Sequence, residues 1–536
     1  MARLAHRSRR ILTTLTGVGM VALTVFPAGA ASADAGAQPF DAAHDTGSLW
    51  SITSMVGAQQ LWDQHYTGAG VGVALIDTGV TRVPGLDGAR KVFYGPDLSF
   101  DSQIPAYADR DQFGHGTHMA SIIAGRDPVG AKRTDCATGD SVCLKRSAYS
   151  DPSHFEGVAP DAHIVSLKVG DHEGANDVTQ VVAAIDWVVA HRNDPKLNIR
   201  VLNISYGTDS TQPAAVDPIA FAAENAWRHG IVVVAAAGND GAAAPALADP
   251  AYSPMVVAVG ASDPMGTLDP ADDTIPDWAN HGTSDRPVDV VAPGVHVAGL
   301  RVPGSVIDRA NPSAVVGDRF FRGSGTSQAA AVVSGVAALL VDKYPTATPD
   351  QIKAMLRAGA RAFGSRGDGK QAFRGRGSVD GSAAVSIVAT PAAGGSDGSG
   401  SIEASRGSTV VADDGTELHG EQDIFGNPWN ASDYVAAVST DSVWSGGTWR
   451  GSVWAADGWL TFGRWGTSPW TGLTDWAGNT FDNQGGDIAW DGSRWSGSRW
   501  TGSRWSGSRW SGSRWSGSRW SGSRWSGSRW SDADWN

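Results

Sequence analysis

A carboxylate and an imidazole stand where a catalytic pair would need them. Asp77 ends the apolar run 71–76, and open α/β folds place their sites at the carboxyl ends of parallel strands. His115 lies in the segment Gly-His-Gly-Thr-His, directly before an apolar stretch with helical spacing. A carboxylate beside an imidazole can orient it as a general base. Each feature alone also has a structural explanation, because Asp-Thr-Gly is a common turn after a strand.

A second histidine, His118, follows three residues after His115 and raises the alternative of a metal site. Zinc-protease helices carry a glutamate directly after the first histidine, and here that position is Gly116. The sequence offers no obvious third ligand. We therefore expect no catalytic metal, and we expect His118 to be a structural residue packed beside His115.

A nucleophile and an amide donor complete the set. Ser327 follows Gly-Ser-Gly-Thr and precedes an apolar helix, so its hydroxyl would stand at the positive end of that helix. Asn239 follows the apolar run 231–236, where its amide could donate to an oxyanion. Taken singly, the serine could be a helix N-cap and the asparagine a turn residue. Together the four residues predict nucleophilic hydrolysis.

The elements that must position these residues are predicted by short β-branched runs that alternate with longer helical segments between residues 48 and 387. The clearest strands are expected at 71–76, 164–169, 201–204, 231–236 and 256–259, and the clearest helices at 177–191, 215–229 and 327–343. Strands that alternate with helices form parallel sheets covered on both faces. The predicted fold class is α/β, with a doubly wound, mostly parallel sheet and helices on both faces.

Four segments resemble, in order, the signature of the subtilisin-like serine proteases: Asp77-Thr78-Gly79, His115-Gly116-Thr117-His118, Asn239 and Gly325-Thr326-Ser327. The resemblance covers about 48–387. It implies a catalytic triad of Asp77, His115 and Ser327, with Asn239 as an oxyanion donor. It further implies substrate-backbone binding by Ser205, Tyr206 and Gly207, opposite Gly174. The implied activity is a serine endopeptidase that acts on protein or peptide substrates and needs no cofactor.

The family often binds structural calcium, but no particular ligand loop can be matched here. Four acidic residues are candidate calcium ligands, but they are explained equally well as solvated surface charges: Asp171, Asp177, Asp272 and Asp273. The sequence also departs from the family pattern after the nucleophile. Gln328 replaces the usual methionine, and Ala331-Val332 replaces the usual Pro-His pair. All four chemical positions are intact, so we expect activity to be retained.

Two other functions compete with proteolysis. A lipase of the α/β-hydrolase type needs its histidine after the nucleophile, and the only histidine after Ser327 is His419, beyond a predicted linker. A secreted wall-binding protein with a protease-like scaffold has no physical need of all four site residues. Both functions therefore rank below the endopeptidase.

Residues 1–33 have the layout of an export signal, with arginines, an apolar run at 11–26 and a small-residue end. The pair Arg9-Arg10 also resembles a twin-arginine signal, and the sequence does not choose between the two routes. The apolar run is short for a membrane span, so we expect no transmembrane anchor after signal removal. We expect a secreted protein, extracellular or associated with the cell wall. The short segment 34–47 leaves no room for the folding prodomain of secreted relatives, so self-maturation is not expected.

Two global features narrow the possible partners and the chemistry. Cys136 and Cys143 are the only cysteines, and in an oxidising compartment they form a candidate disulfide. The formal net charge of −13 argues against sequence-independent binding to nucleic acid.

The composition changes after residue 387. Residues 388–405 are rich in Gly, Ser and Asp and predict a flexible linker, and 406–536 form a Trp-rich, low-complexity repeat region. From Trp490 to Trp535 a tryptophan recurs at every fifth residue. Three interpretations stay open: a module packed through Trp and Arg stacking, an exposed surface for cell-wall glycans, and a disordered appendage.

Overall fold

A computed structural model describes residues 40–128, 149, 151–241, 246–362, 374–389, 391, 394–460, 464–466, 470–481 and 509–510. The predicted signal 1–33, Cys136 and Cys143 lie outside the described residues, as does the pentad repeat apart from the backbone of 509–510. In the part of the chain that is described, no helix combines the length and the apolar character needed to cross a membrane.

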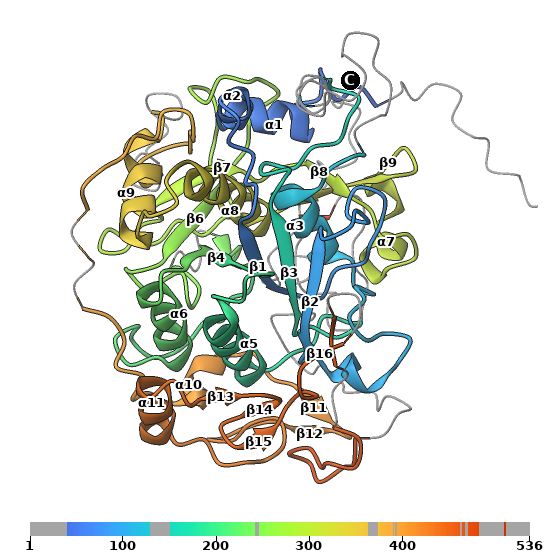
Figure 1. Cartoon of the computed structure of the whole chain (residues 1–536), viewed down its shortest axis with the longest axis vertical. Coiled ribbons are helices and arrows are strands. Elements are labelled where there is room, and N and C mark those ends of the chain that lie inside the picture. Colours follow the sequence, from blue (N-terminus) through green and yellow to red (C-terminus); the bar gives the residue numbers. More distant parts are fainter. Residues whose placement is uncertain are drawn as a thin grey trace, which may run out of the picture. The chain divides into compact units, whose positions relative to one another are not determined.

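The largest sheet has the strand order β16-β17-β2-β3-β1-β4-β5-β6-β7, and its strands from β2 to β7 in this order are all parallel (Figure 1). The bounds of these parallel strands are β1 Gly72–Asp77, β2 Val92–Asp97, β3 His163–Lys168, β4 Ile199–Ile204, β5 Val232–Ala236, β6 Val257–Ser262 and β7 Val290–Pro293. Strands β1, β5 and β6 are buried along their whole length, so both faces of the sheet are covered. The predicted α/β fold class is confirmed.

The strand order reverses at β1. From β1 the chain passes to β2 and β3 on one side, and then to β4, β5, β6 and β7 on the other side. Open α/β sheets bind their ligands in the crevice outside the carboxyl ends of the strands at such a switch point. Asp77 is the last residue of β1 and therefore lies at this position.

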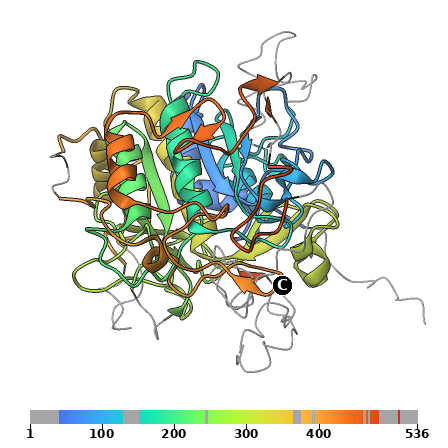
Figure 2. The same cartoon turned by 90° about the horizontal axis from the view of Figure 1, so that it is seen from below.

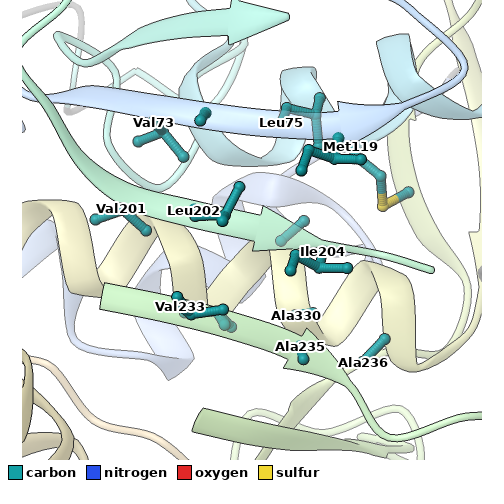
Figure 3. Packing of buried hydrophobic residues seen from close by; sticks show 14 of the residues in the cluster. Val73, Leu75, Met119, Val201, Leu202, Ile204, Val233, Ala235, Ala236 and Ala330 are labelled. Atoms are coloured by element: carbon teal, nitrogen blue, oxygen red, sulfur yellow. The ribbon is translucent and has the colours of Figure 1, made fainter. Parts of the chain in front are cut away.

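Two pairs of helices accompany the sheet. Helix α3 (His115–Ala124) packs on α8 (Thr326–Lys343), and α5 (Val178–His191) packs on α6 (Pro218–Arg228). Helix α5 begins with a capping box formed by Asp177 and Gln180. In Figure 3, aliphatic side chains of β1, β4 and β5 pack around Ala330 of α8 and Met119 of α3. The predicted helices are present, and their ends shift by at most three residues.

The other elements between residues 49 and 359 connect this core. They are α1 Leu49–Met55, α2 Ala58–Asp63, η1 Phe100–Gln103, β8 Val297–Leu300, α7 Val306–Ala310, η3 Pro312–Ala314, β9 Val315–Val316, β10 Phe320–Ser324 and α9 Pro349–Gly359. Strand β10 pairs with β8 and β9, and also with β18 (Arg509–Trp510).

Described residues between 394 and 481 form a segment that we call the C-terminal wrap. Its elements are α10 Ile402–Arg406, β11 Ala412–Asp413, β12 Thr416–Glu417, α11 Ala431–Ser439, β13 Trp444–Ser445, β14 Thr448–Trp449, β15 Ser452–Val453, β16 Trp459–Leu460 and β17 Arg464–Trp465. Figures 1 and 2 show this segment, in orange, beside α5 and α6. Strand β17 also extends the large sheet by pairing with β2.

The described part of the predicted linker 388–405 differs from a flexible connection. Ser396, Ile402 and Ser405 are buried, and Ser396 Oγ donates a hydrogen bond to the backbone carbonyl of Asp217 (2.8 Å). Its Gly- and Ser-rich composition permits close approach to α6, because small side chains leave the backbone free to pack. Residues 394–405 thus include buried positions that pack near α6.

The described tryptophans of the wrap form its core. Trp449, Trp454 and Trp470 are fully buried, and the rings of Trp449 and Trp454 lie 4.9 Å apart in an edge-to-face arrangement. Trp465 packs edge-on against Trp187 of α5, with 5.4 Å between the ring centroids. For these residues the structure agrees with a packed module and not with an exposed glycan surface.

Candidate active site

The carboxylate and the imidazole meet at the end of β1. Nδ1 of His115 lies 2.8 Å from Oδ1 and 3.0 Å from Oδ2 of Asp77, and both side chains are buried. Gly116 permits this approach, because a Cβ there would lie 2.1 Å from the backbone oxygen of Gly79. An ionised Asp77 accepts from Nδ1–H, which leaves Nε2 as the basic nitrogen of His115.

A third residue, Asp111, holds this arrangement and was missed by the sequence analysis. Its carboxylate accepts from the backbone N–H groups of Gly114 (2.6 Å) and Thr117 (2.7 Å) at the start of α3, and from Oγ1 of Thr78 (2.8 Å). It thereby supplies the cap that Gly114 lacks and ties His115 to the Asp-Thr-Gly turn. Burial raises the pKa of Asp111. An aspartate three residues before Gly114 was the signal for this role.

His118 has the structural position that the sequence analysis expects. It is buried, and its Nε2 lies 2.9 Å from the carbonyl oxygen of Phe321 and 3.1 Å from the backbone nitrogen of Gly299. Burial lowers the pKa of His118 to about 3. Within the described residues, the one group with metal-ligand geometry contains neither His115 nor His118.

Ser327 and Asn239 are brought together by Thr326. The N-cap of α8 is Gly325, so Ser327 lies in the first turn of the helix and is not a capping serine. The backbone N–H of Thr326 donates to Oδ1 of Asn239 (3.0 Å), and Oγ of Ser327 lies 3.4 Å from the carbonyl oxygen of Ser205. The hydrogen bond from Thr326 fixes the orientation of the Asn239 side-chain amide. The amide nitrogen therefore lies on the side away from Thr326.

The predicted substrate segments flank these residues. Ser205, Tyr206 and Gly207 follow β4, and Oγ of Ser205 accepts from the side-chain amide of Asn203 (2.8 Å). Gly174 lies in the loop between β3 and α5, where its φ of 93° suits glycine. The two segments follow β3 and β4, which are the two neighbours of β1 in the sheet.

An acidic group near the site does not suit calcium. Asp101, Asp171 and His172 have ligand atoms within 4.8 Å of one another. The two carboxylate oxygens of Asp101 already pair with Nζ of Lys168 and Nδ1 of His172, each at 2.7 Å. Calcium prefers oxygen ligands, so an ammonium and an imidazole in this group argue against it. The hydrogen bond to Asp101 raises the pKa of His172 to about 9.

The four acidic residues considered as surface charges lie in different places. Asp171, Asp177 and Asp273 are buried, whereas Asp272 is exposed. Asp177 accepts from the backbone N–H of Thr179 (2.9 Å) as the cap of α5. The surface interpretation is therefore wrong for three of the four, and backbone N–H groups hold the carboxylates of two of them, Asp171 and Asp177.

The part of the chain that carries these residues is similar to known proteins. Residues 68–398 match the model of the Subtilase family. The chain is 33% identical over 303 residues to the serine protease AprX of Bacillus subtilis (strain 168), a match that covers 55% of this chain and 62% of AprX. It is 30% identical over 316 residues to a thermostable alkaline protease of Halalkalibacterium halodurans, covering 59% and 69% of the two chains. It is also 28% identical over 315 residues to subtilisin E of Bacillus subtilis, covering 58% and 66%.

Proposed function

Because the chain belongs to the subtilase family, we propose that it is a secreted serine endopeptidase with Asp77, His115 and Ser327 as its catalytic triad. The observation that carries this proposal is the contact of His115 Nδ1 with both carboxylate oxygens of Asp77 at the switch point of the sheet. A buried aspartate in this contact has a clear use, since it orients a base.

In the proposed mechanism, Asp77 holds the tautomer of His115, and Nε2 of His115 takes the proton of the Ser327 hydroxyl as its oxygen attacks the peptide carbonyl. The oxyanion receives hydrogen bonds from the Asn239 amide and the Ser327 backbone N–H. His115 then gives its proton to the leaving amine, and water releases the acyl group from Ser327.

The substrate is proposed to be a protein or peptide whose backbone lies between Gly174 and the segment Ser205-Tyr206-Gly207. We also propose that residues 1–33 act as the signal that directs export of the protein. Binding of cell-wall glycans gains no support from the wrap, because its most buried tryptophans are taken up by its own core.

The test is labelling with a fluorophosphonate probe, together with casein cleavage, in wild type and Ser327→Ala. We expect both signals in wild type and a loss of at least about 1,000-fold in the variant, since removal of a triad member costs this much or more. A matched control is Ser334→Ala, because Ser334 lies on α8 and its hydroxyl bonds to Asn203. This control should still label. A folded wild type that neither labels nor cleaves would favour a scaffold function.

A further inference from the structure

Helix α10 of the C-terminal wrap contacts the chain next to both substrate segments. Its last side chain, Arg406, pairs with Asp177, three residues after Gly174. In the same helix, the backbone carbonyl oxygen of Ser405 accepts a hydrogen bond from Oγ1 of Thr208, the residue directly after Gly207. We propose that α10 is a brace that holds the two substrate segments at a fixed separation, with Arg406 as its positioning residue. The inference rests on the proposed function, because that function assigns the two segments to substrate binding.

Arg406 is built into the interior as a connector. Its side chain is 2% exposed, and Nε donates to Oδ2 of Asp177 at 2.7 Å. The other donors of the guanidinium reach Glu403 and the backbone oxygens of Gly420 (2.6 Å) and Gln422 (2.5 Å). A guanidinium presents five N–H donors in a fixed planar fork, whereas the ammonium of a lysine has only three donors on one atom. Nearby Asp177 and Glu403 raise the pKa of Arg406 against the opposing effect of burial.

The contact at Asp177 fixes one end of the Gly174 loop. Oδ1 of Asp177 caps α5 by accepting from Thr179, so Oδ2 is left for Arg406. Asp171 closes the other end, because its Oδ1 accepts from the backbone N–H of Ala175 at 2.7 Å. Gly174 is therefore held between a carboxylate at each end. A shift of Asp177 would move Gly174 without touching the triad.

The contacts at Thr208 fix the other segment. Thr208 is fully buried, and its Oγ1 lies 2.6 Å from the carbonyl oxygen of Ser405. The backbone N–H of Thr211 donates to the carbonyl oxygen of Ala404 (3.0 Å), and the N–H of Ser408 donates to Oδ1 of Asp209 (2.9 Å). The last carbonyls of a helix need outside donors, and the chain after Gly207 supplies them here. One turn of helix thus bonds to the chain beside both predicted substrate segments.

The experiment compares two classes of substrate in wild type, Arg406→Lys and Thr208→Val. A p-nitrophenyl ester of acetate reports on the nucleophile, and a tetrapeptide anilide also reports on backbone binding by the two segments. For the anilide we expect kcat/KM to fall roughly 10-fold in Arg406→Lys and about 3-fold in Thr208→Val, mainly through KM. Ester turnover and fluorophosphonate labelling should stay within about 2-fold of wild type.

The matched control is Asp186→Asn. Asp186 also joins α5 to the wrap, and within the described part of the chain its side chain bonds to Trp449 and Tyr434 and to neither substrate segment. We expect Asp186→Asn to lower the melting temperature and to leave the ratio of anilide to ester activity unchanged. If Arg406→Lys does not fold, Thr208→Val decides the question alone.

Three results are distinguishable. Selective loss of anilide activity in the two brace variants, and not in Asp186→Asn, supports the brace. Equal loss of ester and anilide activity, or no loss at all in a folded variant, overturns it. A folded wild type that is inert to the fluorophosphonate overturns the proposed function itself, whatever the variants do.

Discussion

Two buried carboxyl groups, those of Asp249 and Asp217, lie close together beneath the segment that follows Gly207. Oδ1 of Asp217 caps α6 by accepting from the backbone N–H of Ile219 (2.8 Å), and its Oδ2 accepts from Ser405 Oγ (2.9 Å). Burial raises the pKa of Asp249 well above its usual range, and the neighbouring Asp217 raises it further. Asp249 therefore holds a proton in the folded protein at pH values where the unfolded chain has lost it.

This proton makes stability depend on pH in a defined direction. A raised folded-state pKa gives a contribution that is full below the ordinary aspartate pKa and is lost as the pH rises through the raised value. We expect the free energy of unfolding of Asp249→Asn, relative to wild type, to improve with rising pH by up to about 1.4 kcal/mol per pH unit. Urea unfolding across the pH range checks this.

The exposed Asp285 offers a control for that measurement, since Asp285→Asn should follow the wild-type pH profile. Parallel profiles for wild type and Asp249→Asn would show that Asp249 does not retain its proton.

Gln328, directly after Ser327, is buried in the first turn of α8. A methionine at this position would be an oxidisable thioether beside Ser327, and its sulfoxide would be bulkier and polar. We expect wild type to keep at least about 80% of its labelling after mild peroxide, and Gln328→Met to lose more than about half. Equal sensitivity of the two proteins would place the damage elsewhere, and reduction by a methionine sulfoxide reductase should restore only the variant.

At the scale of elements, α5 and the wrap are joined by a buried hydrogen-bonded group. The indole N–H of Trp449 donates to Oδ2 of Asp186 (2.8 Å), and the Tyr434 hydroxyl donates to Oδ1 (3.2 Å). Burial raises the pKa of Asp186 to about 7 despite these two donors. When the Asp186 carboxylate is ionised, the hydrogen bonds from Trp449 and Tyr434 therefore stabilise its buried charge.

Trp449→Phe keeps an aromatic ring but removes one donor from a buried carboxylate. We expect the free energy of unfolding to fall by about 1–3 kcal/mol, with kcat unchanged. Trp476→Phe is the matched control, because its indole N–H donates to a backbone oxygen, that of Thr416, in a more exposed place. Urea unfolding of both variants measures the difference, and equal losses would contradict the role given to Asp186.

The elements of the core could be predicted because their signals are local. Strands such as β1 and β5 are continuous apolar runs, and α5 begins with its own capping box. Asp77, His115, Asn239 and Ser327 each follow or start such an element. The wrap could not be predicted in this way, because its Gly- and Ser-rich sequence is also typical of linkers. The link from Arg406 to Asp177 joins residues 229 positions apart, and no local pattern signals it.

At the scale of the whole molecule, the described residues before 387 and the wrap share one interior. Trp187 and Phe100 contact Trp465 and Trp470 of the wrap. A chain that ends at residue 387 would expose these aromatic surfaces and leave Asp177 buried without Arg406. Loss of one partner from a buried pair costs about 3–5 kcal/mol.

We therefore expect the variant that ends at residue 387 to be insoluble or unfolded. A variant that ends at residue 483 retains the whole wrap, and we expect it to be soluble, folded and labelled by the fluorophosphonate. Soluble yield, thermal unfolding and labelling of the two truncations test this. A stable, active protein ending at 387 would show that the wrap is dispensable.

The pairing of β17 with β2 has a consequence for the time course of biosynthesis. Strand β2 ends near residue 97, yet its outer edge is covered by residues made more than 360 positions later. At about 5–20 residues per second, the ribosome needs roughly 5–20 s to pass from residue 387 to the end of the wrap. During that interval Ser327 has been synthesised, but β17 has not. The interior that the two parts of the chain share is thus complete only after the last part of the wrap has left the ribosome.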